Sequence, residues 1–126
     1  MLNERNSSAI VAVSNLDRAR TFYRDTLGLE LVSESMGVMV FRTGSTQLSV
    51  YESKFAGSNL ANAVTWTMFD DLREVVSELG AKGVKFEHYE DLPGLTLRGD
   101  VHEAGAVLLA WFKDPDGNIL HLVEGM

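Results

Sequence analysis

The chain contains no cysteine, and this absence removes several kinds of chemistry together. Without thiols there is no disulfide, no thiolate nucleophile, no iron–sulfur cluster and no cysteine-ligated zinc. Histidine is scarce as well, because the 126 residues include only His88, His102 and His121. Imidazole is the side chain that ordinarily titrates near neutral pH, so acid–base chemistry or imidazole-metal chemistry depends on these three residues.

Positive charge and long apolar runs are also in short supply. Eleven lysines and arginines stand against eighteen acidic residues, which gives a formal net charge of −7. Because an acidic surface repels phosphate backbones, we expect no nucleic-acid partner. No apolar run approaches the roughly 20 residues of a membrane span, and the first residues lack the apolar segment of a signal peptide. We therefore expect a cytoplasmic protein without a membrane partner, whose acidity serves solubility and only weakly indicates cationic ligands.

The first half of the chain predicts a strand, a helix and three further strands. Ser8 to Val13 is short, apolar and β-branched, as is typical of a strand. Apolar positions from Leu16 to Leu27 recur at helical spacing, and Gly28 follows where a helix would end. Strands are then predicted over 30–35, 37–43 and 46–52, with glycines at the turns between them.

The second half repeats this order at an interval of about 55 residues. A strand is predicted over 63–69 and a helix from Leu72, followed by strands over 84–90, toward Val101, over 106–113 and over 119–123. The repeat predicts an α+β fold with two tandem βαβββ modules in a single domain, residues 1–126. Module one covers about 8–52, a linker about 53–62 and module two about 63–124. A linker of this kind lets modules exchange between chains, so we expect a homodimer.

Two stretches carry a family resemblance. One runs from Asn15 to Leu29, and the other runs from Trp111 to Leu122 around the turn Asp114-Pro115-Asp116-Gly117-Asn118, which itself predicts a hairpin. They resemble the signatures of the vicinal oxygen chelate superfamily, which includes glyoxalase I, bleomycin-resistance proteins and extradiol dioxygenases. The resemblance covers about Ser8 to Val123. It implies two curved sheets that form a cleft, with the helices outside: the glyoxalase/bleomycin-resistance/dioxygenase fold.

A metal enzyme of this family takes His, Gln or Glu ligands, one from each of four strands. The resemblance places the four positions at Ser8, Ser49, Val64 and His121. If the register slips by two residues, Gln47 replaces Ser49 at the second of these positions. Only His121 has a typical ligand side chain, and one imidazole does not hold a divalent ion. We therefore expect no metal and no other cofactor, unless His88 or His102 rebuilds the site, and this argues against metal-dependent glyoxalase I.

Period-two alternation along the strands assigns side chains to the two faces of each sheet. It directs Ile119 and Val123 to the cleft together with His121, and it directs Leu120 and Leu122 to a helix. The same alternation places Val64 in the cleft. The predicted ligand-binding residues are Ser8, Gln47, Ser49, Tyr51, Trp66, Met68, Trp111 and His121. Such an aromatic and methionine-rich cavity suits a small organic molecule with flat or apolar parts, although aromatic side chains on strands also commonly fill a core.

Two functions fit these residues. The first is a small-molecule-binding protein, similar to the bleomycin-resistance proteins, that works without the family metal. The alternative is a metal-free or atypical glyoxalase-like lyase or isomerase, in which His121 is the catalytic general base and Tyr51 or Gln47 polarises a carbonyl. A general base needs a side chain that orients it, and the sequence identifies none for His121. Binding is therefore the favoured interpretation.

Overall fold

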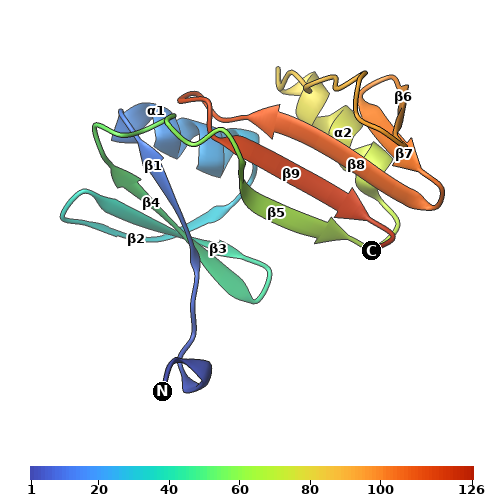
Figure 1. Ribbon diagram of the computed structural model, residues 1–126. Coiled ribbons are helices and arrows are strands. Elements are labelled where there is room, and N and C mark those ends of the chain that lie inside the picture. The colour runs from blue at the N-terminus through green and yellow to red at the C-terminus, as the bar shows by residue number, and fades with distance from the viewer. The chain divides into compact units, whose positions relative to one another are not determined.

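The computed structural model describes residues 1–126 and divides into two compact units, Met1–Ser58 and Asn59–Met126 (Figure 1). Each unit contains one β-sheet and one main helix, and the predicted α+β class is confirmed. No helix combines the length and the apolar character that crossing a membrane requires.

The first unit contains a four-stranded sheet. Its strands are β1 (Ala9–Val13), β2 (Glu30–Ser35), β3 (Val38–Thr43) and β4 (Thr46–Glu52), in the order β1-β4-β3-β2. β1 runs parallel to β4, and the other neighbours are antiparallel. A 3-10 turn, η1 (Leu2–Glu4), precedes the sheet.

The helix predicted from Leu16 onward consists of two parts, an α-helix, α1 (Leu16–Arg20), and a π-helical segment, η2 (Thr21–Thr26). It begins where the side chain of Asn15 accepts a hydrogen bond from the backbone N–H of Arg18 at 2.9 Å. It ends before Gly28, whose φ of 75° is a left-handed conformation that glycine adopts without strain.

Alternation along the strands separates a buried face from an open face in this unit. The buried side chains come from the helical segment and from alternate strand positions: Val11, Val13, Ala19, Tyr23, Met39, Phe41, Leu48 and Val50. Tyr23 is fully buried, and its ring centroid lies 5.9 Å from that of Phe41. The intervening positions, among them Ile10 and Ser49, therefore lie on the other face.

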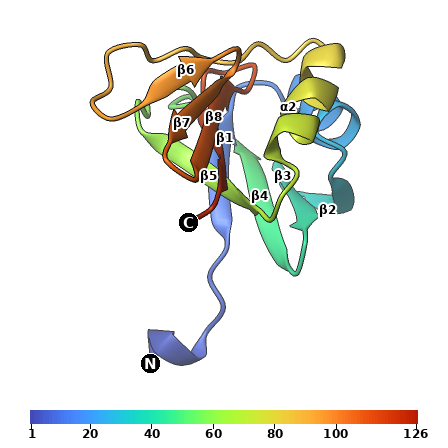
Figure 2. The same ribbon diagram turned by 90° about the vertical axis from the view of Figure 1, so that its right-hand side faces the viewer.

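The second unit contains a five-stranded sheet in the order β5-β9-β8-β7-β6. The strands are β5 (Asn62–Met68), β6 (Thr96–Arg98), β7 (Val101–Ala104), β8 (Val107–Lys113) and β9 (Ile119–Glu124). β5 and β9 are parallel, and the remaining pairs are antiparallel. Helix α2 (Leu72–Ala81) covers one face of this sheet, where Leu72, Phe112 and Leu120 are almost completely buried (Figure 2).

The strand predicted over 84–90 is wrong, because only an isolated bridge between Phe86 and Phe112 forms there. β7 pairs with β8 as far as Leu109 and so occupies the first part of that edge of β8. The segment 84–90 reaches only the remaining part, where the N–H of Glu87 donates to the carbonyl of Trp111 at 2.7 Å. The strand that pairs with β8 is instead β7, which forms a hairpin with β6.

The turn between β8 and β9 is organised by one buried carboxylate. Asp114 is 4% exposed, and its Oδ1 accepts hydrogen bonds from the N–H groups of Asp116 at 3.0 Å and Asn118 at 2.9 Å. Its Oδ2 accepts from the Asn118 side-chain amide at 2.8 Å. Gly117 completes the turn with a φ of 90°. These contacts fix the start of β9, the strand that carries His121.

We predict that Asp114→Ala destabilises the protein by about 2–4 kcal/mol, because it leaves N–H donors without an acceptor in a buried turn. Urea unfolding would measure the loss. Asp91→Ala, which removes an exposed carboxylate from a loop, serves as the matched control and should cost less than about 0.5 kcal/mol. Equal midpoints for the two variants would contradict this role of Asp114.

Candidate functional site

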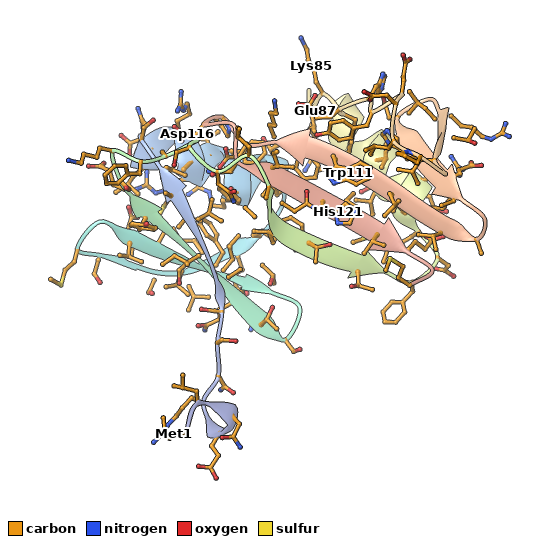
Figure 3. The ribbon with its side chains drawn as sticks, in the orientation of Figure 1. Met1, Lys85, Glu87, Trp111, Asp116 and His121 are labelled. Carbon is orange, nitrogen blue, oxygen red and sulfur yellow. The ribbon has the colours of Figure 1, made fainter.

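His121 lies in the middle of the second sheet, on the face opposite α2. β9 is flanked by β5 and β8, and in their registers His121 pairs with Thr65 on one side and Trp111 on the other. Paired residues on adjacent strands share a face, so these three side chains form a row across the three strands. Figure 3 shows Trp111 and His121 next to each other in this row.

Trp111 supports the site from beside His121. The two rings are stacked, with centroids 4.9 Å apart and planes inclined by 22°. Both side chains are largely buried, and the indole N–H of Trp111 donates to Oδ1 of Asn62 at 3.1 Å. One tryptophan thus positions the imidazole through its ring face and an amide through its N–H group.

Each nitrogen of His121 has a distinct environment. Nδ1 lies 2.9 Å from the hydroxyl oxygen of Thr65, whereas Nε2 is buried and has no hydrogen-bond partner. Burial lowers the pKa of His121 below its ordinary value of 6.5. The imidazole is therefore neutral at neutral pH, with Nδ1 beside the Thr65 hydroxyl and Nε2 buried without a protein partner.

An open cavity of about 460 Å³ adjoins this row. Its lining combines amide, hydroxyl and imidazole groups with apolar side chains: Asn62, Ala63, Val64, Thr65, Thr67, His121, Val123 and Met126. His121 and Val123 were predicted to share this face, whereas Asn62, Thr65 and Thr67 were missed. No sequence signal identifies Thr65, because its partner is 56 positions away along the chain.

The predicted face of Trp66 and Met68 is wrong. In the β5–β9 register these residues pair with Leu122 and Glu124, so they lie on the face opposite His121. The apolar members of β5 therefore face the side that α2 covers, and Thr65 and Thr67 take the open side. A register shift between Asn62 and Val64 precedes this alternation, and strand patterning alone does not reveal such a shift.

Four of the predicted ligand residues belong to the first unit. Ser8 and Gln47 line a separate, polar cavity of about 680 Å³ together with Arg5, Asn6, Ser7, Ser45 and Thr46. Ser49 and Tyr51 alternate with buried residues of β4 and therefore share the open face with Gln47. Neither of them lines that cavity. The structure thus places Ser8 with Gln47, and it places His121 in the cavity of the other unit.

The other two histidines have protein partners. Nε2 of His88 lies 2.7 Å from a carboxylate oxygen of Asp100 at the surface. His102 is fully buried, and its Nε2 accepts a hydrogen bond from the backbone N–H of Tyr89 at 2.9 Å. Nowhere in residues 1–126 do three or more His, Asp or Glu side chains group so that they could hold a metal ion. The four positions that the resemblance implies hold two serine hydroxyls, one imidazole and a valine, which has no donor atom. This set does not fit the family metal.

Solved structures with this architecture match the chain along almost its full length. A glyoxalase family protein from Enterococcus faecalis is 20% identical with a TM-score of 0.73, and the match covers 98% of this chain and 100% of that protein. The fosfomycin resistance protein FosX from Listeria monocytogenes is 15% identical with a TM-score of 0.72, covering 96% and 93%. Lactoylglutathione lyase from Agrobacterium tumefaciens is 22% identical with a TM-score of 0.66, covering 95% and 92%.

None of the curated proteins matches the sequence. The model of the family described as Glyoxalase/Bleomycin resistance protein/Dioxygenase superfamily matches residues 7–122. This match confirms the resemblance that the two sequence motifs carried, and the solved structures agree with it in fold. The chain therefore belongs to the Glyoxalase/Bleomycin resistance protein/Dioxygenase superfamily.

Proposed function

We propose that this protein binds a small organic molecule in the cavity beside His121, without the family metal. The observation that carries the proposal is His121 itself, which lines that cavity and has a buried Nε2 without a hydrogen-bond partner. An unsatisfied polar atom in a buried position costs free energy, and a ligand with a complementary hydrogen-bonding group would remove that cost. Cytoplasmic location and homodimer formation stay predictions.

The cavity lining indicates what kind of molecule would fit. Asn62 and Thr67 offer hydrogen-bonding groups at the open side, and Val123 and Met126 offer apolar contact area. A compact, partly flat molecule with one or two polar substituents matches this mixture. The net charge of −7 favours a neutral or cationic molecule over an anion.

The two tryptophans provide a matched test of the binding proposal. A panel of neutral and cationic heteroaromatic compounds is screened by the backbone amide shifts of Thr65, His121 and Val123. For the compound that binds, we expect Trp111→Phe to weaken affinity about fivefold to tenfold, because Asn62 loses its hydrogen bond. Trp66→Phe alters the opposite face and should leave affinity within about twofold.

The proposal fails if no compound shifts these amides, or if the shifts map to other parts of the chain. Equal losses in the two tryptophan variants would show that the variants act through general stability and not through the cavity. Urea unfolding of both variants separates these outcomes.

Metal content tests the second part of the proposal. We expect the protein to carry far less than one equivalent of zinc, manganese, nickel or iron after purification, because one imidazole is too few donors. Mass spectrometry of the acid-digested protein gives the content, and a chelator should leave compound binding unchanged. About one equivalent per chain in the wild type, lost in His121→Ala, would overturn the metal-free proposal.

The contact between Thr65 and His121 supports an alternative, a metal-free lyase or isomerase. A general base needs a group that fixes its tautomer and orientation, and Thr65 lies where it can accept a hydrogen bond from Nδ1–H. Nε2 then carries the lone pair, and the lowered pKa keeps it unprotonated at neutral pH. It would remove a proton from the carbon next to a substrate carbonyl and return it to a neighbouring atom.

Deuterium exchange at carbon tests this alternative. Small α-keto and α-hydroxy carbonyl compounds are incubated with the protein in D₂O, and the C–H signals are followed by NMR. His121→Ala should slow exchange by about a hundredfold, and Thr65→Val should slow it more than Thr65→Ser, which keeps the hydroxyl. Because the base acts unprotonated, the rate should fall with decreasing pH, with a midpoint below 6.5. No exchange above the buffer rate with any compound would leave binding as the function.

A further inference from the structure

A second imidazole, that of His102, is held in one defined protonation state by backbone geometry. Its Nε2 lies 2.9 Å from the backbone nitrogen of Tyr89. A backbone N–H can only donate, so Nε2 must present its lone pair. His102 is therefore neutral, with its proton on Nδ1. Protonation of Nε2 would place two N–H groups against each other and break the hydrogen bond.

This hydrogen bond holds Tyr89 inside a cluster of three rings. The Tyr89 ring meets Trp111 edge-on at 5.2 Å and lies 5.8 Å from His102. His102 in turn meets Trp111 edge-on at 5.0 Å. Trp111 also stacks on His121. The hydrogen bond between His102 and Tyr89 therefore holds two rings against the indole that supports the candidate site.

The chain around Tyr89 is tied to the sheet just before it, whereas after it the next strand pairing begins at Thr96 of β6. Glu87 is tied to β8 through its N–H to the Trp111 carbonyl and through an ion pair of 3.0 Å with Lys113. Beyond Tyr89, the segment from Asp91 to Gly94 is exposed. Loss of the bond to His102 would thus free Tyr89 and the residues that follow it, while Glu87 stays in place.

We propose that His102 is a proton-sensitive latch: its neutral Nε2 holds Tyr89 against Trp111, and its protonation releases the segment from Tyr89 to Leu95. The latch goes beyond the proposed ligand site, because it is defined and measured without any ligand. The packing of Trp111 against His121 is the route by which release would reach that site.

Within the cluster of Tyr89, His102 and Trp111, His102 is the side chain that mild acid can protonate. Its direct strand neighbours, Leu97 on β6 and Leu109 on β8, are not ionisable. The phenol of Tyr89 has a raised pKa because of burial, so it stays neutral. Of the imidazoles nearby, His88 faces Asp100 and His121 stacks on Trp111, so both must be separated from His102 by experiment.

Several charges near the latch form ion pairs, and Glu90 and Asp91, which follow Tyr89 in the sequence, are exposed acidic residues. On β7, Glu103 pairs with Arg98 at 2.9 Å and with Arg73 of α2. Burial lowers the pKa of His102 below 6.5, and repulsion from His88 adds to this, while a backbone contact with Leu109 opposes it. A lowered folded-state pKa means that the stabilising contribution is complete above pH 6.5 and is lost as the pH falls through the lower value.

The first experiment measures the tautomer and the release directly. In the double variant His88→Gln, His121→Gln, His102 is the only imidazole, and its ¹⁵N signals report which nitrogen carries the proton. We expect Nδ1–H at neutral pH and a protonation midpoint below 6.5. In the wild type, hydrogen exchange should show the protection of the Tyr89 amide falling about fivefold to tenfold through that transition. The Glu87 amide, bonded to β8, should keep its protection and is the internal control.

Variants then assign the transition. His102→Gln offers an amide oxygen that accepts the Tyr89 N–H at every pH, so the acid-dependent loss should disappear. His88→Gln and His121→Gln should each retain it. The proposal is overturned if His102 carries its proton on Nε2 at neutral pH, or if Tyr89 and Glu87 lose protection together. It is equally overturned if His102→Gln keeps the transition or His88→Gln abolishes it. If His102→Gln does not fold, the tautomer and the wild-type exchange still decide.

Discussion

The position of β9 between β5 and β8 determines every contact that His121 makes. A parallel neighbour on one side supplies Thr65, and an antiparallel neighbour on the other supplies Trp111. Neither contact is local in sequence, and both follow from register, because a shift by one residue would turn His121 toward α2. The buried carboxylate of Asp114 fixes where β9 begins and so protects this register. Site and fold therefore depend on the same strand pairing.

Much of the architecture was predictable because it rests on local signals. Asn15 and Gly28 mark the ends of the first helical segment, and the turn around Gly117 marks the hairpin that carries His121. Period-two alternation placed Leu120 and Leu122 on the α2 face of β9 and His121 on the other, although all residues from Leu120 to Val123 are buried. The two motifs also identified the superfamily, which the match over residues 7–122 confirms.

The parts that could not be predicted depend on pairing between distant segments. β5 has apolar and polar side chains on alternate positions, and only its register with β9 shows that Trp66 lies on the α2 side and Thr65 on the open side. The segment 84–90 has strand-like composition, but β7 already occupies most of the available edge of β8. Propensity describes a segment, whereas edge availability is a property of the assembled sheet. For the same reason the orienting partner of His121 became visible only in the structure.

Two of the three imidazoles meet the same indole, and their opposite arrangements give them different uses. The Nε2 of His102 accepts a hydrogen bond from the backbone N–H of Tyr89, so the protonation state of His102 is coupled to the position of Tyr89. His121 has an unpartnered Nε2 and lines the cavity in which we propose that a ligand binds. Because Trp111 packs against both rings, displacement of the indole from one side changes the packing on the other. Linkage requires that such an effect is reciprocal: if release of the latch weakens ligand binding, then bound ligand must lower the pKa of His102 further.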